Sequence, residues 1–413
     1  MTSFQSKFNR SVWPEQSGEP QRLGIAVSGG GDSIALLRAL HDWAIGKDIS
    51  IFAITVDHGL RPEAAEEARF VANLCATMSI PHDTVQWANW DGLGNKQNAA
   101  RQARRTFIIR WARDHRIDTV ALGHTQDDQA ETLVMRLARG SGVDGLSAMA
   151  KDMSSDGVRW VRPLLEVSRS ELRDYLRGID QPWYDDPSND DPTYDRVRTR
   201  QVIEALDLDQ PRLAATARRM QMASAALAQF AHAMARNIAT VGAGSILLNQ
   251  QALQDAPEET RYRLLSHGLQ WVSSSIYRPR FSALCDAWMG LEAGRGQSLH
   301  GCLLKHAKGQ ILICRELHAV ATCEVVAPEV WDSHWVVDNP AYAGFTIRAL
   351  GEDGLRQSPD WRLQNLPRVV LLSAPSLWQN QRLCHAPLAG VGDKLAISSK
   401  NQPEDFFLSL LTH

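Results

Sequence analysis

Short apolar segments alternate with amphipathic segments along the first half of the chain. Four segments have the apolar, β-branched character of buried strands: 23–28, 49–57, 82–87 and 118–123. Between or after them, apolar residues recur at helical spacing in the segments that begin near residues 33, 62 and 95, and again around residue 130. Strands that alternate with helices predict parallel β-α-β units. We therefore expect an α/β fold with a doubly wound parallel sheet, whose ligands bind at the carboxyl ends of the strands.

The pattern changes near residue 206. The segments 211–240 and 252–290 are helical in character, whereas 330–413 mixes tryptophans and prolines with short β-like runs such as 369–372. At 413 residues the chain is longer than one ordinary domain of roughly 150 residues. We therefore predict an N-terminal tail (1–20), an α/β catalytic domain (21–205), a mainly helical domain (206–325) and a small α+β domain (326–413).

A glycine-rich segment, Ser28-Gly29-Gly30-Gly31-Asp32-Ser33, follows the first predicted strand and opens a helix. We call residues 28–33 the phosphate loop. Glycines let the backbone approach a ligand closely, and the N–H groups at the helix start form a concave anion site, to which the two serine hydroxyls add donors. Asp32 would repel phosphate unless a cation lay between them, which indicates Mg²⁺. The loop lacks the Gly-Lys-Ser/Thr ending of a Walker A motif. The alternative is a strand-to-helix turn without a ligand.

A second group of polar residues lies at the end of another predicted strand, in the segment 123–132. His124 and Asp128 are four positions apart, so they share one face if the helix has already begun at His124. Such a pair can bind a cation and a nucleophile, or move a proton near neutral pH. The alternative interpretation is helix capping by Thr125 or Asp127, together with acids that are favoured in a first turn.

The overall charge of −3 does not indicate a nucleic-acid partner, but arginines are clustered locally. Six of them fall between Arg101 and Arg116 against the single acid Asp114, and two further groups are Arg196, Arg198, Arg200 and Arg212, Arg218, Arg219. These groups suit phosphate binding, or else form solvated helix faces. The six cysteines form no Cys-x-x-Cys pair, which is typical of structural thiols in a reducing compartment. There is no apolar run of about 18 residues and no secretory signal at the start, so we expect a cytoplasmic protein.

The phosphate loop resembles that of the PP-loop (N-type ATP pyrophosphatase, adenine nucleotide alpha hydrolase-like) superfamily. Within it, the chain is similar to the tRNA(Ile)-lysidine synthetase family in several segments: Gly123–Thr132 followed by Arg139-Gly140-Ser141-Gly142, His58-Gly59-Leu60-Arg61, Ala100–Arg104, and Asp186-Pro187-Ser188-Asn189. The likeness covers roughly residues 22–205 and thins afterwards. Two positions depart from the family: Thr125 replaces its second histidine, and Val197 replaces the asparagine of its Arg-Asn-x-x-Arg motif.

The resemblance implies a specific reaction. ATP, as co-substrate with Mg²⁺, adenylates the C2 oxygen of the wobble cytidine in a tRNA(Ile) with a CAU anticodon, and L-lysine then displaces AMP to give lysidine. It further implies that Asp32 binds Mg²⁺, that Arg104 steadies the α-phosphate or the activated base, and that His124 and Asp128 orient lysine and the reacting groups. Arg196 or Arg200 would contact the nucleotide, and ATP would be bound by the phosphate loop and His58. The mainly helical domain at 206–325 would bind the tRNA substrate.

Three alternatives compete with this interpretation. A tRNA thiolase of the same superfamily generally needs paired cysteines, which are absent from the sequence. A small-molecule amide synthetase would not need the arginine clusters or the appended domains. A non-catalytic tRNA-binding protein predicts a decayed phosphate loop, whereas residues 28–33 are intact.

Overall fold

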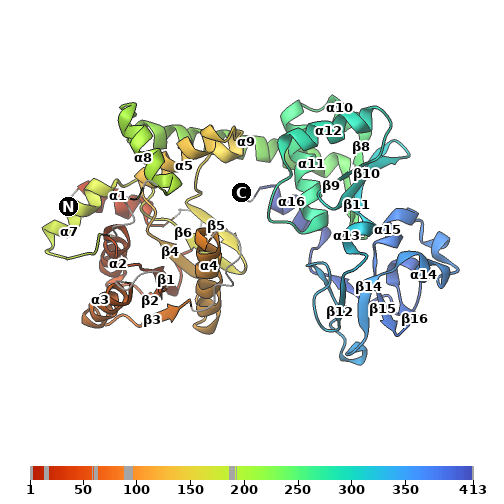
Figure 1. Cartoon of the computed structure of the whole chain (residues 1–413), viewed down its shortest axis with the longest axis horizontal. Helices are drawn as coiled ribbons and strands as arrows, with labels where there is room; N and C mark the ends of the chain where they lie inside the picture. The colour runs from red at the N-terminus through yellow and green to blue at the C-terminus, as the bar shows by residue number, and fades with distance from the viewer. Residues whose placement is uncertain are drawn as a thin grey trace. The chain divides into compact units, whose positions relative to one another are not determined.

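The computed structural model describes residues 3–13, 18–57, 59, 64–87, 96–185, 191 and 193–411. The chain forms two compact units, one within residues 1–224 and one within residues 225–412 (Figure 1). The boundary between the units falls inside the long helix α9 (Gln210–Ile238). The predicted subdivision of the later part at residues 325 and 326 stays a prediction.

The first unit contains the predicted alternation of strands and helices. Its elements are, in chain order, α1 (Ser3–Ser11), β1 (Arg22–Ala26), α2 (Gly31–Ala44), β2 (Ser50–Asp57), α3 (Ala64–Thr77), β3 (His82–Gln86), α4 (Lys96–Asp114), β4 (Thr119–Leu122), α5 (Gln126–Ala138), α6 (Val143–Leu146), β5 (Asp152–Ser155), β6 (Val158–Val161), α7 (Arg169–Gly178) and α8 (Asp195–Ala205).

The sheet of this unit has the strand order β3-β2-β1-β4-β6-β5. All neighbouring pairs are parallel except β5 with β6. From β1 the chain moves outward through β2 and β3, and then returns to place β4 on the other side of β1. This reversal makes the ends of β1 and β4 a topological switch point, the place where open α/β sheets bind their ligands. The doubly wound sheet expected from the sequence is confirmed.

Each face of the sheet has a core of its own. In β1, Leu23 and Ile25 pack with α1, α2, α3 and α7, whereas Ala26 packs on the opposite face with α4. The predicted tail at 1–20 differs from the structure, because α1 buries Phe4 and Phe8 in the first of these cores. The N-terminal segment is mostly polar, so the sequence analysis missed that Phe4 and Phe8, four positions apart, lie on one helix face.

The second unit combines helices with antiparallel sheets. Its elements after α9 are β7 (Ala239–Gly242), β8 (Ser245–Asn249), α10 (Gln250–Asp255), α11 (Glu258–Ser273), α12 (Phe281–Glu292), β9 (Gln297–Leu299), β10 (Cys302–Ala307), β11 (Gln310–Arg315), α13 (Leu317–Val320), β12 (Glu324–Val326), β13 (Trp335–Val336), η2 (Pro340–Tyr342), β14 (Thr346–Ala349), α14 (Gly351–Arg356), η3 (Trp361–Gln364), α15 (Arg368–Leu372), β15 (Pro375–Gln379), β16 (Arg382–His385), η4 (Pro387–Ala389), β17 (Ser398–Ser399) and α16 (Pro403–Ser409).

Two features of this unit differ from the sequence-based expectation. The part expected to be mainly helical also contains a five-stranded antiparallel sheet in the order β7-β8-β11-β10-β9, against which α11 packs. The run 369–372, expected to be β-like, lies in helix α15. Pro367 precedes that helix as its N-cap and Val370 and Leu371 are buried, so packing of a short turn overrides the β preference of valine. A second sheet, β12-β14-β15-β16, completes the unit.

No helix in the described part of the chain is both long enough and apolar enough to cross a membrane.

Gly123 follows β4 directly, so a substitution there tests how closely the end of β4 packs against the phosphate loop. A Cβ at this position would lie 3.2 Å from the carbonyl oxygen of Asp32 and 3.2 Å from Cα of Ser33, so alanine would push on the backbone of the phosphate loop. We expect Gly123→Ala to lower the free energy of unfolding by about 1–3 kcal/mol in urea denaturation. Gly178→Ala is the matched control, because nothing lies within 4 Å of a Cβ there. Equal stability of the two variants would contradict the close approach.

Candidate active site

The phosphate loop turns sharply between β1 and α2 and is held by its own serine. Gly29 has φ +87°, a conformation that favours glycine. The Ser33 hydroxyl donates to the Gly30 carbonyl oxygen (2.9 Å) and accepts from the Ser28 N–H (3.1 Å). Ser33 is buried and Ser28 is exposed, so Ser33 shapes the loop, whereas Ser28 can donate to a ligand. The first N–H groups of a helix have no acceptor one turn earlier, which leaves them able to bind an anion. At the start of α2, the Ser33 N–H already donates to the Gly30 carbonyl oxygen at 3.0 Å.

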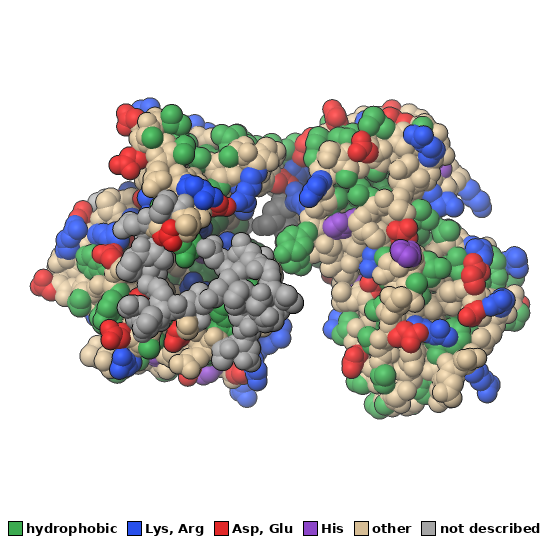
Figure 2. Space-filling model, viewed as in Figure 1, with side chains coloured by type: hydrophobic (Ala, Val, Ile, Leu, Met, Phe, Trp, Pro, Cys, Tyr) green, Lys and Arg blue, Asp and Glu red, His purple; other side chains and the backbone are tan. Residues whose placement is uncertain are grey.

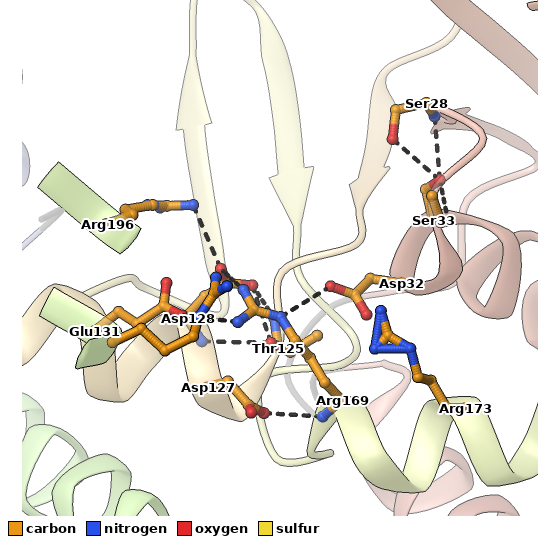
Figure 3. Close-up of polar contacts among 12 residues, drawn as sticks. Ser28, Asp32, Ser33, Thr125, Asp127, Asp128, Glu131, Arg169, Arg173 and Arg196 are labelled. Atoms are coloured by element: carbon orange, nitrogen blue, oxygen red, sulfur yellow. Dashed lines mark hydrogen bonds and ion pairs between the residues drawn. The ribbon is translucent and has the colours of Figure 1, made fainter. Parts of the chain in front are cut away.

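Asp32 lies in the first turn of α2 and faces α7 (Figure 3). Burial raises the pKa of Asp32 to about 6, Arg169 opposes this shift, and the nearby Asp128 carboxylate adds to it. One carboxylate oxygen, Oδ2, accepts from Nε of Arg169 at 3.3 Å. The other, Oδ1, is buried without a hydrogen-bond partner among the described residues. A buried carboxylate oxygen without a partner is costly unless a ligand or cation completes it.

Helix α5 begins after β4 with a reciprocal cap. The Thr125 hydroxyl accepts from the Asp128 N–H (3.3 Å), and Oδ2 of Asp128 accepts from the Thr125 N–H (2.8 Å) and hydroxyl (3.0 Å). Thr125 is the N-cap, so His124 precedes the helix and does not share a helix face with Asp128. Thr125, where the family has a histidine, therefore serves as the cap, which is the alternative considered from the sequence.

The guanidinium of Arg169, at the start of α7, joins three carboxylates from two helices (Figure 3). Nη2 donates to Oδ1 of Asp128 at 2.7 Å, Nη1 donates to Oε1 of Glu131 at 2.7 Å, and Nε donates to Asp32. The backbone N–H of Arg169 also donates to Oδ2 of Asp127 at 2.8 Å. Burial alone would lower the pKa of Arg169, but these carboxylates raise it above its ordinary value, so the side chain stays charged.

Helix α8 adds two more arginines to the same carboxylates. Nη1 of Arg196 lies 3.4 Å from Oδ1 of Asp128, and Nε of Arg200 lies 3.2 Å from Oε1 of Glu131. Burial would raise the pKa of Asp128, but Arg169 and Arg196 together hold it below its ordinary value. Val197, the other departure from the family motif, lies between Arg196 and Arg200 in the sequence. Its side chain is buried and does not take part in this network.

Asp128 already accepts hydrogen bonds at both carboxylate oxygens, whereas Glu131 does not. Oε2 of Glu131 is buried without a hydrogen-bond partner among the described residues, and so is Nδ1 of His124. Burial lowers the pKa of His124 to about 3, with Asp128 opposing this and nearby arginines adding to it, so the imidazole is neutral at physiological pH. Asp32, Glu131 and His124 therefore each offer an unused polar atom to a ligand.

Near His124, Arg104 and Arg162 interact more strongly with other arginines than with acids. Burial and Arg101 lower the pKa of Arg104, and burial together with Arg101 and Arg105 lowers the pKa of Arg162 to about 10. Arg104 forms no hydrogen bond or ion pair with the described residues. Arg162 donates from Nη1 to the Ala150 carbonyl oxygen at 2.6 Å, and its Nε is buried without a partner within the described ranges. Half-buried cations that repel one another are suited to binding an anion.

The predicted site residues are thus largely brought together. The phosphate loop, Asp128, Arg196 and Arg200 lie around the Arg169 network, and His124 with Arg104 lies beside it. His58 and the segment 186–189 lie outside the described residues. Sequence reasoning missed Arg169 and assigned no role to Glu131. Ser168 and Glu171 form a capping box, a pattern visible in the sequence that indicates a helix start at Arg169, but not where its side chain points.

No group of three or more histidine, cysteine or acidic side chains that could enclose a metal ion occurs in the described part of the chain. A cation at Asp32 would therefore need further ligands from the substrate or water. This is the usual binding mode of Mg²⁺, which is held by one or two carboxylates plus phosphate oxygens.

Comparison with known proteins agrees with this geometry. Residues 1–206 match the family model of the PP-loop domain. A tRNA(Ile)-lysidine synthase of Ruegeria pomeroyi is 42% identical over 397 residues, which cover 95% of this chain and 95% of the relative. A protein of the same name from Wolbachia pipientis is 33% identical and covers 85% of this chain and 81% of its own length. Another, from Rhodopseudomonas palustris, is 40% identical over 248 residues, or 58% of this chain and 72% of the relative.

Removing the shared guanidinium tests the network. Arg169→Ala leaves buried carboxylates without their main cation, so we expect the free energy of unfolding at neutral pH to fall by about 3 kcal/mol. Because Arg169 helps to hold the pKa of Asp128 below its ordinary 3.8, the Asp128 part of this loss is fully present above that value. It shrinks as the pH falls through the lower pKa of the folded state. Urea denaturation over a series of pH values measures both effects.

The control for this variant is Arg173→Ala, one turn further along α7. Arg173 pairs with the exposed Asp185 at 3.0 Å, so its loss is expected to cost less than about 1 kcal/mol. An Arg169→Ala variant as stable as this control would contradict the central role of the guanidinium.

Proposed function

Because the chain belongs to the tRNA(Ile)-lysidine synthase family, whose members are ATP-using ligases, we propose that it joins L-lysine to the wobble cytidine of a CAU-anticodon tRNA(Ile) in the cytoplasm. In the first step the C2 oxygen of cytidine attacks the α-phosphorus of ATP, and the bond to the β-phosphate breaks to release pyrophosphate. In the second, the ε-amine of lysine, having lost a proton, attacks C2. The C2–O bond then breaks and AMP leaves with the oxygen.

One observation carries this proposal: the phosphate loop and the acidic residues of α5 meet at a single guanidinium. Arg169 contacts Asp32 on one side and Asp128 with Glu131 on the other. A nucleotide held by the loop and a cationic substrate held by the acids would therefore lie side by side. Holding two reactants in this way supplies much of the rate enhancement of a two-substrate reaction.

The residues present fit Mg²⁺ at Asp32. Oδ1 of Asp32 has no partner among the described residues, and Asp32 lies in the first turn of α2, at the helix start that would bind the anion. When bound, the ion would neutralise charge on the phosphates of ATP. Asp32 would hold it, and the protein would position the triphosphate through the loop amides and the exposed Ser28 hydroxyl.

Glu131 is the best candidate to receive the lysine substrate. Its Oε2 is buried and lacks a partner in the described part of the chain, and an ammonium group would satisfy it. Asp128, to which the sequence assigned this role, is occupied by Thr125, Arg169 and Arg196 and is better suited to orienting them. The neutral His124 can exchange hydrogen bonds with the reacting groups without adding charge.

Arginines near His124 supply the opposite charge. Arg104, Arg162 and Arg196 all act electrostatically on His124. Negative charge develops on the α-phosphate during adenylation, and cations already fixed in place stabilise it without reorganisation. We assign Arg104 to the α-phosphate, and Arg196 or Arg200 to the nucleotide.

The decisive measurement is incorporation of labelled lysine into RNA. Purified protein with ATP, Mg²⁺, labelled lysine and the CAU tRNA(Ile) is expected to transfer label to the tRNA and to release pyrophosphate. A matched tRNA transcript with an altered wobble base serves as the control and should remain unlabelled. Pyrophosphate release without labelled tRNA would support only an ATP pyrophosphatase of the same superfamily and would contradict lysidine formation.

Asp32→Asn is expected to raise the stability of the protein and to lower its activity. The pKa of Asp32 is about 6 in the fold against an ordinary 3.8, so the wild type loses stability as the pH rises through this window. The amide removes that loss, and the variant should be more stable at neutral pH by roughly 1–2 kcal/mol. Pyrophosphate release should nevertheless fall about a hundredfold or more, because the metal-binding carboxylate is gone. Near-normal turnover of a folded variant would contradict the proposal that Asp32 binds Mg²⁺.

A further inference from the structure

Arg173 is the second arginine of α7, one turn after Arg169, and its side chain points from that helix toward Asp32 (Figure 3). Burial raises the pKa of Asp32 to about 6, and Arg173, like Arg169, opposes this rise, so its positive charge lies near that carboxylate. The Arg173 side chain is 32% exposed. A half-buried cation is therefore present beside the first turn of α2, where the phosphate loop would bind an anion.

The segment that follows α7 runs along the phosphate loop. The Tyr184 N–H donates to the Gly29 carbonyl oxygen at 3.0 Å, and Tyr184 forms a parallel β-bridge with Gly30. A Cβ on Gly31 would lie 3.3 Å from the ring of Trp183, so this ring packs directly on the loop. The segment thus brings the indole N–H of Trp183 next to the predicted anion site.

Asp185, the next residue of the segment, is bound by both of these donors. Its Oδ1 accepts from Nη2 of Arg173 at 3.0 Å and from Nε1 of Trp183 at 3.2 Å. The Asp185 side chain is 69% exposed, and an exposed ion pair costs little to break. A phosphate oxygen is also an anionic acceptor, and guanidinium groups bind phosphates as well as carboxylates, so a phosphate can replace Asp185.

An ion pair on α7 does not by itself indicate a site. Over α7, at the left of Figure 2, basic and acidic side chains lie next to one another on the surface. Arg177 and Asp174, for example, form an exposed pair at 3.0 Å within the helix. Arg173 differs from Arg177 because its charge acts on Asp32 and because its acidic partner also accepts from a residue that packs on the phosphate loop.

We propose that Arg173 exchanges Asp185 for the terminal phosphates of ATP, so that its guanidinium binds the β- and γ-phosphates beside the phosphate loop. The proposal deepens the proposed function and rests on it for the use of ATP. During adenylation the bond from the α-phosphorus to the bridging oxygen breaks, and its electron pair stays on the departing pyrophosphate. Arg173 would remain bound to this group and stabilise the charge that develops there.

The test is the affinity of the full-length protein for α,β-methylene ATP with Mg²⁺, measured by isothermal titration calorimetry. Arg173→Ala should raise Kd about tenfold or more, because a charged hydrogen-bond partner is lost. Arg173→Lys keeps the charge and should raise Kd less. Asp185→Asn removes the competing carboxylate and should lower Kd by up to about fivefold. AMP lacks both terminal phosphates and should bind Arg173→Ala and the wild type alike.

The matched control is Arg177→Ala, which removes the exposed arginine one turn further along α7 and should leave Kd unchanged. The opposite signs expected for Arg173→Ala and Asp185→Asn are decisive. Equal weakening by both would mean that the pair only holds the segment against the loop, and would overturn the proposal. Wild-type affinity in Arg173→Ala, or an equal loss of AMP binding, would also overturn it.

The outcome is separable from that of the proposed reaction. Absence of lysine transfer together with the expected changes in Kd would overturn the reaction but not the role of Arg173. Lysine transfer by a protein whose Kd does not respond to Arg173→Ala would do the reverse.

Discussion

The site depends on one buried guanidinium shared by carboxylates from separate helices. Arg169 brings Asp32 of α2 together with Asp128 and Glu131 of α5, all substantially removed from water. Without the cation these acids would repel one another and carry uncompensated charge in a poorly solvated place. With it, each is held in a fixed position, and two of them still have an oxygen that no described residue uses. The ion-pair network therefore fixes the positions of the carboxylates, but it leaves one oxygen of Asp32 and one of Glu131 for a ligand.

The topology of the sheet explains why these residues can meet. β1 and β4 are neighbours in space although β2 and β3 lie between them in sequence, so the loops that follow them open at the same edge. Gly123 allows the end of β4 to approach the backbone of the phosphate loop closely. Helix α7 packs on the same face as α2 through Leu172 and Leu176, which directs its first residue, Arg169, toward the loop.

Charge is distributed unevenly around this centre. The acids of α5 are neutralised by arginines of α7 and α8, whereas burial and neighbouring arginines lower the pKa of the half-buried Arg104 and Arg162. One region therefore suits a cation and the adjacent region suits an anion. The proposed reaction, in which a positively charged amino acid displaces AMP from an adenylated nucleotide, would use both regions.

The sequence by itself determined the parts of this protein that depend on local chemistry. The alternation of strands and helices, the glycine-rich loop with Asp32, and the caps at Thr125 and Ser168 all follow from periodicity and from backbone requirements that neighbouring residues satisfy. Only the tertiary structure decided which acids are occupied and which are available. Arg169 is far from Asp32 in sequence, and its role arises from helix packing. The same holds for the sheet of 239–315 and for α15, where long-range pairing and burial override local preference.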